Sequence, residues 1–174
     1  MFHPTPTEKA FITAAALQIG VRPDDLNALI SFESNYNPQA KNPYSSARGI
    51  LQFTDAAAQG LGYKNSYDLT QKNKTFAAQI KNAAIPYLLR YAPFPSQQSL
   101  YLSVFYPAAR SWPDTQHFPD HIKKINPGIN TVRDYINLVN SKKSLPFIVP
   151  FSIILVVTLL FLFTRRQSNE EKED

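Results

Sequence analysis

Hydrophobic and polar positions follow helical spacing from the first residues of the chain onward. A helix is predicted over residues 8–19, with Thr7 as its N-cap and Gly20 as the residue that ends it. A second helix is predicted to begin at Pro23, because proline suits the first helical turn. Its apolar stripe consists of Leu26, Leu29 and Ile30.

The middle of the chain alternates between loops and helices. The stretch 35–49 is rich in Asn, Pro and Ser, which predicts a loop. A short helix is expected after Thr54, and a longer one over about 75–91 with a bend at Pro86. No stretch alternates convincingly between apolar and polar residues, so any sheet is predicted to be small.

The chain up to residue 140 predicts two more helices. Ser96 caps one that runs to about 106, and Thr131 caps another that runs to about 140. Residues 113–130 between them predict irregular structure. The expected fold class is therefore mainly α, with a small irregular or β element.

One segment near the C-terminus differs from everything before it. Residues 145–163 are nineteen residues without a charge. As a helix they would span roughly 28 Å, close to the hydrocarbon thickness of a bilayer. Two lysines precede the segment and two arginines follow it, which places cations at both headgroup levels. We expect one C-terminal transmembrane helix over 145–164; a buried core helix is the alternative.

Composition narrows the classes of function. The formal net charge of +5 suits an acidic polymer or an anionic membrane surface. No basic run or helix-turn-helix pattern predicts a nucleic-acid partner. With no cysteine, disulfides and thiolate chemistry are excluded. His3, His117 and His121 do not form a convincing metal cluster, so neither a metal nor another cofactor is expected.

Glu33 is the first candidate for chemistry. It lies on the same helical face as Leu26 and Ile30. Desolvation on an apolar face raises the pKa of a carboxyl, which is what a general acid needs near neutral pH. Periodicity alone favours the simpler alternative, a helix-end glutamate that faces solvent.

The residues after Glu33 change this balance. They read ES at 33–34, NPQA at 37–40, SSA at 45–47 and GILQ at 49–52. This run resembles the first two motifs of the soluble lytic transglycosylases, the goose-lysozyme-like family that cleaves peptidoglycan. That family shows Glu-Ser, Asn-Pro-x-Ala, a small-residue loop and Gly-Leu-Met-Gln. Here Leu51 stands in place of the methionine, a swap of similar volume.

Two later stretches resemble the same family more weakly. The sequence VFYPAA at 104–109 lies where the family has Ala-Tyr-Asn-Ala-Gly, so that Tyr106 matches the tyrosine. Pro107 and Ala109 depart from the family's Asn and Gly. The sequence TVRDYI at 131–136 is similar to the family's late Glu-Thr-x-x-Tyr-Val element, which implies that Tyr135 lies near the glutamate.

The resemblance implies a lysozyme-like (goose-type) helical domain and roles for five residues. The expected organisation is a lytic transglycosylase-like catalytic domain over 1–140, a linker over 141–144, the transmembrane helix over 145–164 and a short charged tail over 165–174. Glu33 is the implied catalytic acid, and the implied substrate-binding residues are Gln52, Tyr106, Tyr135 and Ser46. On residue type alone, these four fit structural roles equally well: a buried amide, two core aromatics and a loop hydroxyl.

The implied reaction is cleavage of the bond between N-acetylmuramic acid and N-acetylglucosamine, with a 1,6-anhydro product. Glycosidases ordinarily use two carboxylates, but the sequence offers no clear second one, since Asp55 fits a helix start. The family resembled here uses a single glutamate. One alternative is a goose-type muramidase that cuts the same bond with water. Another is a non-catalytic structural or peptidoglycan-binding membrane protein, which the departure at Pro107 favours.

Location is inferred from the order of the segments. The N-terminal residues lack the basic region and long apolar run of a signal peptide, although the expected catalytic domain precedes the membrane segment. We therefore expect a single-pass protein in the virion of a bacteriophage with an internal membrane, where it opens the wall at genome entry. A bacterial inner-membrane enzyme or a lysis enzyme is the alternative. The expected partners are peptidoglycan glycan strands, the lipid bilayer through 145–164 and other virion proteins.

Overall fold

The computed structural model describes residues 3–143. Over these residues, none of the helices is long and apolar enough to cross a membrane. The transmembrane helix expected over 145–164 and the tail over 165–174 lie outside the described residues. The division of the chain into a domain over 1–140, a linker over 141–144 and a membrane segment therefore stays a prediction.

The described part of the chain is mainly helical, as expected. Its α-helices are α1 (Pro6–Ile19), α2 (Pro23–Ser34), α3 (Asp55–Gly60), α4 (Ser66–Lys72), α5 (Phe76–Gln79), α6 (Ile85–Leu89), α7 (Gln97–Phe105), α8 (Asp120–Ile125) and α9 (Val132–Asn140). A π-helical turn (Ile80–Ala84) joins α5 to α6, and a 3-10 turn (Pro107–Ala109) follows α7. In place of a small sheet, residues 3–143 show isolated bridges between Lys41 and Arg48, Arg48 and Phe53, and His117 and Thr131.

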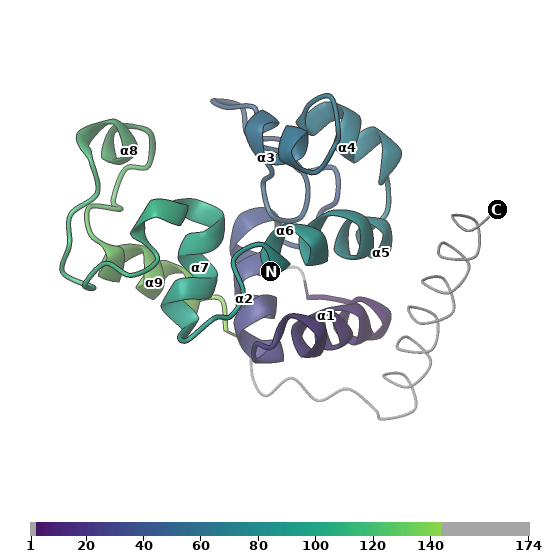
Figure 1. Ribbon diagram of the computed structural model, residues 1–174, viewed down its shortest axis with the longest axis horizontal. Helices are drawn as coiled ribbons and strands as arrows, with labels where there is room; N and C mark the ends of the chain where they lie inside the picture. The colour runs from purple at the N-terminus through teal and green to yellow at the C-terminus, as the bar shows by residue number, and fades with distance from the viewer. Residues whose placement is uncertain (1–2, 144–174) are drawn as a thin grey trace.

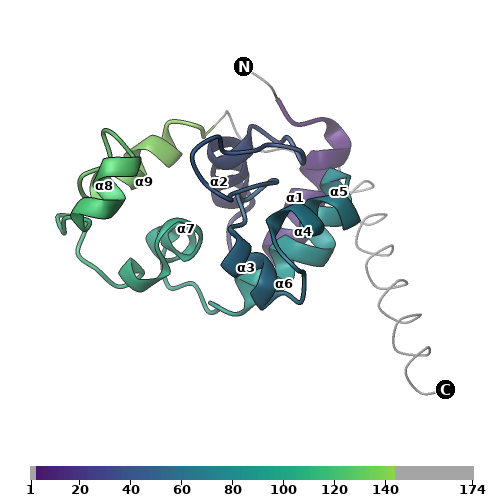
Figure 2. The same ribbon diagram turned by 90° about the horizontal axis from the view of Figure 1, so that it is seen from above.

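Helix α2 lies at the centre of the fold. In Figure 1, α7, α8 and α9 lie on one side of it and α3 to α6 on the other, and the view from above in Figure 2 shows the same arrangement. Helix α2 packs against α1 and α9. Every residue from Asp25 to Ile30 is buried, including the predicted stripe of Leu26, Leu29 and Ile30. A helix buried on all sides is a core element, so it holds whatever follows it in a fixed position.

The first helix begins two residues earlier than predicted. Thr5, rather than Thr7, is the N-cap: its hydroxyl accepts from the backbone N–H of Glu8, and the Glu8 carboxylate accepts from the Thr5 backbone N–H at 2.8 Å. This reciprocal capping box satisfies two helix-end donors, and Pro6 fits the first helical position. The predicted end is confirmed, because Gly20 adopts the left-handed conformation with a φ of 76°.

Two short helices were not predicted. Helix α4 begins at Asn65, whose side chain caps the backbone N–H of Asp68. Helix α8 lies within 113–130, where irregular structure was expected, and none of its residues is buried. Since a short helix without a buried face has no apolar period, hydrophobic spacing does not reveal it.

The helix predicted over about 75–91 exists, in three pieces. A π-helical turn ends just before Pro86, where the predicted bend lies. Because Pro86 has no N–H, the carbonyl of Asn82 lacks its usual helical donor. The hydroxyl of Tyr63 donates to that carbonyl at 3.4 Å. The remaining predicted caps, Ser96 and Thr131, are confirmed, and Thr54 caps the short helix that was expected to follow it.

Candidate active site

Glu33 lies in the last turn of α2, one residue before the helix ends. The residue is partly exposed, whereas the residues from Asp25 to Ile30 in the same helix are buried. The apolar stripe of α2 therefore leads up to a carboxyl at the edge of the core. This placement gives the carboxyl both an apolar surrounding and an opening to solvent.

Tyr135 from α9 reaches Glu33 across the core. Its hydroxyl donates to Oε1 of Glu33 at 3.1 Å, and the two residues are 102 positions apart in the chain. The Tyr135 ring is buried, stacks on Phe105 with centroids 4.2 Å apart, and meets the edge of Phe32 at 5.6 Å. Aromatic packing on both sides leaves the ring little freedom, so the hydroxyl is aimed at the carboxyl. The predicted proximity of Tyr135 to the glutamate is confirmed.

The electrostatics of Glu33 suit an acid. Burial raises the pKa of its carboxyl from an ordinary 4.5 to about 7, although the hydrogen bond from Tyr135 lowers it. Burial also raises the pKa of Tyr135 well above 10, and the nearby Glu33 carboxylate adds to that rise. Tyr135 therefore stays a neutral donor at neutral pH. Glu33 is about half protonated there, and can both give and accept a proton.

Ser34, the serine directly after Glu33, connects the end of α2 to the next motif. Its hydroxyl lies 3.0 Å from the carbonyl of Ile50 and 3.2 Å from that of Ile30, within hydrogen-bonding distance of both. The first contact ties the end of α2 to the GILQ stretch at 49–52. The two motifs of the sequence are thus joined directly in space, next to Glu33.

Left-handed backbone conformations cluster around this junction. Asn35 and Tyr36, directly after α2, have φ values of 51° and 66°, and Gln52 has a φ of 47°. Residues other than glycine adopt this backbone conformation at a cost in free energy and keep it only where the surrounding structure enforces it. For Tyr36 the surroundings include the hydrogen bond from its buried hydroxyl to Asn27 at 3.1 Å. The loop beside Glu33 is therefore held in one shape.

Gln79 of α5 holds the same loop in place, and this residue was not predicted from the sequence. Its side chain is fully buried, accepts from the backbone N–H of Ile50 at 2.9 Å, and donates to the carbonyls of Pro38 and Asn73. It also lies so close to Gly49 that a Cβ there would collide with its amide oxygen. A lone glutamine inside a helical stretch carries no signal of this role.

Gln52 and Ser46, predicted to bind substrate, make internal contacts in the loop. The amide of Gln52 donates to the carbonyl of Gly49 at 3.0 Å. The hydroxyl of Ser46 accepts from the backbone N–H of Asp55 at 3.1 Å, at the start of α3. Both contacts fit the structural alternative, and a role in binding substrate stays a prediction.

Tyr106 lies at the end of α7, in an aromatic cluster with Trp112 and Phe118. Its ring is partly buried against Trp112 at 5.6 Å and the edge of Phe118 at 6.0 Å. Phe118 also meets Phe105, which stacks on Tyr135. Tyr106 is therefore linked to the tyrosine at Glu33 through two intervening rings, and its contact with substrate stays a prediction.

Asp55, considered as a second carboxylate, has a structural role. Its Oδ1 accepts from the backbone N–H of Ser66 at 2.9 Å and from the Ser66 hydroxyl at 2.8 Å. These bonds hold the pKa of Asp55 below its usual range. The carboxylate thus joins the starts of α3 and α4. Over residues 3–143, no group of three or more acidic, histidine or cysteine side chains is placed to hold a metal.

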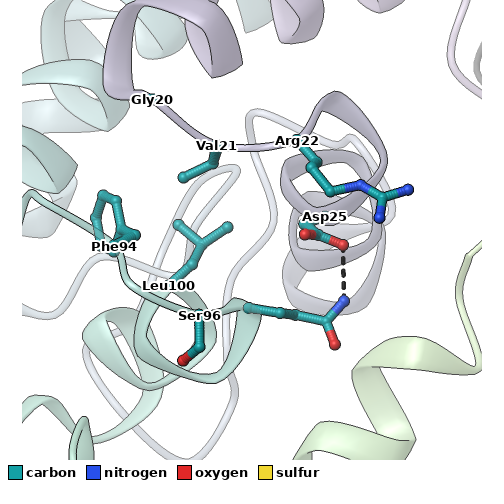
Figure 3. Close-up of a pocket in the computed structure, with 8 residues that line it drawn as sticks. Gly20, Val21, Arg22, Asp25, Phe94, Ser96 and Leu100 are labelled. Carbon is teal, nitrogen blue, oxygen red and sulfur yellow. Dashed lines mark hydrogen bonds between the residues drawn. The ribbon is translucent and has the colours of Figure 1, made fainter.

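A pocket of about 250 Å³ lies at the other end of α2, between the α1–α2 turn and the start of α7. Figure 3 shows its apolar wall of Val21, Phe94 and Leu100 facing the polar side chains of Asp25 and Arg22. Asp25 and Glu33 are eight helical positions apart, which corresponds to about 12 Å along the helix axis. The pocket is therefore distinct from the surroundings of the candidate acid.

Comparison with known proteins agrees with this geometry. Residues 10–91 match the model of the family described as "Transglycosylase SLT domain", over just under half of the chain. The match supports a relation to the lytic transglycosylases, a peptidoglycan substrate and lytic transglycosylase activity in general. Neither the curated proteins nor the solved structures contain a match to the chain.

Proposed function

We propose, with that family match as premise, that this chain is a peptidoglycan lytic transglycosylase. It cleaves the bond between N-acetylmuramic acid and N-acetylglucosamine and leaves a 1,6-anhydro product, with Glu33 as its only catalytic carboxyl. The observation that carries the proposal is the pair of Glu33 and Tyr135, in which a partly exposed carboxyl with a pKa of about 7 receives a hydrogen bond from a buried tyrosine.

Protonated Glu33 begins the reaction. It gives its proton to the glycosidic oxygen as the bond from that oxygen to C1 of the muramic acid breaks. The substrate's own acetamide oxygen bonds to C1 and compensates the positive charge that develops there. Glu33, now a carboxylate, takes the proton of the C6 hydroxyl, and O6 displaces the acetamide from C1. Glu33 regains its proton, and no water is consumed.

This route asks one carboxyl to act first as acid and then as base. A pKa near the working pH suits both roles, since neither protonation state is strongly disfavoured. Tyr135 stabilises the carboxylate form between the two steps because it donates to Oε1. Asp55, with its Oδ1 occupied by Ser66, is not needed as a partner.

Digestion of purified sacculi tests the proposal. The wild type is expected to release 1,6-anhydro muropeptides, and Glu33→Gln to release none while its circular dichroism and cooperative thermal unfolding remain those of a folded protein. Mass spectrometry separates the rival reaction, because a goose-type muramidase adds one water and leaves a reducing end. Cleavage retained in Glu33→Gln would overturn the assignment of the acid.

A non-catalytic peptidoglycan-binding protein is the rival outside enzymes. Pro107 and Ala109 form a 3-10 turn after Tyr106, where the lytic transglycosylases carry an asparagine and a glycine. A zymogram distinguishes the two, since a binding protein is retained by sacculi without clearing them. Clearing by the wild type and not by Glu33→Gln would exclude it.

We further propose that the enzyme is carried in a bacteriophage virion, anchored in a membrane by 145–164, and opens the wall at genome entry. The uncharged run at 145–163 supports the anchor. Protease protection of purified particles or inverted vesicles tests the location. Residues 3–143 protected in intact particles support the virion, and protection in vesicles from uninfected cells would instead support a bacterial inner-membrane enzyme.

A further inference from the structure

Helix α9 and the turn after it run alongside α2 in the opposite direction. Tyr135 of α9 meets Glu33, near the end of α2. Eight positions further on, Nζ of Lys143 lies 2.8 Å from Oδ1 of Asp25, eight positions before Glu33. The two contacts therefore fasten one segment to α2 at two points about 12 Å apart.

Asp25 is the buried end of the second contact. Its side chain is 9% exposed, whereas that of Lys143 is 33% exposed. The Gln97 amide donates to Oδ1 of Asp25 at 2.7 Å, and this bond is the dashed line at the labelled Asp25 in Figure 3. The same amide lies 3.1 Å from the hydroxyl of Tyr101, which donates to Asn140 at the end of α9. Asp25 is thus the centre of a polar network that gathers α2, α7 and the end of α9.

Helix α9 depends on such contacts for its position. It has nine residues, and a helix of that length is marginal without tertiary contacts. Its start is held by backbone bonds from Val132 to Gln116 and from Arg133 to Asp114. Its other end is held by the contacts of Asn140 and Lys143. Tyr135 lies between these two points of attachment.

We propose that Asp25 and Lys143 are positioning residues that hold the end of α9 on α2 and thereby keep the Tyr135 hydroxyl on Glu33. They touch neither substrate nor the reacting atoms. Without the pair, Val132 and Val139 still bury α9 against the core. The helix then stays packed on the core but is no longer held at one position along α2, and the Tyr135 hydroxyl moves out of hydrogen-bonding distance of the Glu33 carboxyl.

The kinetic consequence rests on the proposed function, but the positional one does not. The hydrogen bond from Tyr135 lowers the pKa of Glu33, so a displaced hydroxyl raises it. Two other titratable side chains lie near Glu33 and Tyr135. One is Tyr87 of α6, whose pKa is raised in part by the charge of Glu33. The other is Tyr101 of α7, whose carbonyl lies 3.5 Å from the Tyr135 hydroxyl. Both have a pKa raised above 10 by burial and stay neutral in the range where Glu33 titrates.

The test compares neighbouring residues of the same type in the full chain, held in detergent micelles. Lys143→Met and Asp25→Asn break the pair. Lys142→Met and Asp24→Asn make the same chemical changes one position away, and the Asp24 carboxylate forms an exposed ion pair with Arg22 at 3.9 Å. The pKa of Glu33 is measured by carboxyl carbon NMR, with its signal identified as the one missing in Glu33→Gln.

Lys143→Met is expected to raise the pKa of Glu33, as Tyr135→Phe does, and Lys143→Arg to restore it. In the Tyr135→Phe background, Lys143→Met should change nothing further, because the hydroxyl that it displaces is already gone. In sacculus digestion, Lys143→Met should lower kcat/KM roughly three- to tenfold, again without an added effect in Tyr135→Phe. The two control variants should match the wild type in both measurements.

A merely structural pair gives a different result. Lys143→Met would then lower the unfolding temperature and leave the pKa of Glu33 unchanged, and its effects would add to those of Tyr135→Phe; either observation overturns the proposal. Should Asp25→Asn fail to fold, Lys143→Met and Lys143→Arg still decide the question from the more exposed partner. If Glu33→Gln retained cleavage, the proposed function would fail, and the titration would still report on the positioning.

Discussion

Tyr135 and Glu33 lie 102 residues apart in the chain and 3.1 Å apart in space, and their environments adjust each other. Burial drives the pKa of the carboxyl up while the phenol pulls it down, and the carboxylate in turn raises the pKa of the phenol. The outcome is one group that titrates near neutrality beside one that does not titrate there at all.

Glu33 is expected to lower the stability of the protein as pH rises. Its pKa is about 7 in the folded state against an ordinary 4.5, so the folded state holds this proton more tightly. The stability that protonated Glu33 contributes is complete below about pH 4.5 and is lost as pH rises through about 7. Glu33→Gln, which stays neutral, should therefore gain up to about 3 kcal/mol over the wild type between these limits. Denaturant unfolding of both proteins across this range measures the difference, and a constant difference would contradict the raised pKa.

Tyr135→Phe should move the pH dependence of cleavage. The variant keeps the stacked ring and removes only the hydroxyl that lowers the pKa of Glu33. The alkaline limb of kcat/KM, which follows loss of the Glu33 proton, is expected to shift to higher pH. The maximal rate should fall roughly ten- to hundredfold, because the carboxyl is no longer oriented or stabilised as a base. An unchanged alkaline limb would mean that the hydroxyl does not act on Glu33 in solution.

Asp55→Asn tests whether one carboxyl is enough. Because Oδ1 of Asp55 is occupied by two hydrogen bonds from Ser66, the variant should keep the cleavage activity of the wild type and lose thermal stability. The hydrogen bonds lower the pKa of Asp55, so its stabilising effect is present above its ordinary pKa and is lost as pH falls. Sacculus digestion and thermal unfolding at neutral and acidic pH check both parts. Loss of cleavage in a folded variant would point to a two-carboxylate mechanism.

Gly49→Ala should disturb the loop beside Glu33 more than a comparable change elsewhere. Gly49 and Gly62 both have positive φ angles, 77° and 88°, so alanine is strained at either position. At Gly62 a Cβ meets no atom within 4 Å, whereas at Gly49 it collides with the buried Gln79 amide. We expect both variants to lose about 1–2 kcal/mol of stability and Gly49→Ala to lose roughly a further 1–3 kcal/mol. Equal losses of unfolding free energy in the two variants would show that the contact between a Cβ at position 49 and the Gln79 amide costs no stability.

Two threonines near the N-terminus provide a matched pair for the capping of α1. Thr5→Ala removes the hydroxyl that accepts from Glu8 and should cost about 1 kcal/mol. Thr7→Ala changes an exposed residue inside the first turn and should stay within about 0.5 kcal/mol of the wild type. Thermal unfolding distinguishes the two, and the reverse order would restore Thr7 as the cap.

Most of what surrounds Glu33 in the chain could be predicted from the sequence. The spacing of Leu26, Leu29 and Ile30 indicates α2, because a core helix needs apolar residues at these intervals. The N-cap of α1 could also have been predicted, because Thr5 has a glutamate three positions later. This is the capping-box pattern, which Thr7 lacks. Tyr135 was placed near Glu33 by resemblance to a family, since no local pattern links residues 102 positions apart.

The supporting contacts could not be predicted, and the reason is physical. Gln79 works because three backbone groups from distant loops converge on one buried amide, and convergence leaves no mark on the residues beside it in sequence. Asp25 reads as an acidic residue in the first turn of a helix, a common and exposed position. Only the packed structure shows that it is buried and paired with Lys143.

The long separation between Glu33 and Tyr135 also sets an order of events during synthesis. A ribosome makes α2 early and α9 last among the described helices. Until α9 docks, Glu33 has neither the tyrosine nor its ring beside it and behaves more like an ordinary surface carboxylate. A chain truncated before α9 therefore lacks the Tyr135 contact, and Glu33 acquires its native environment only once α9 has been made and has docked.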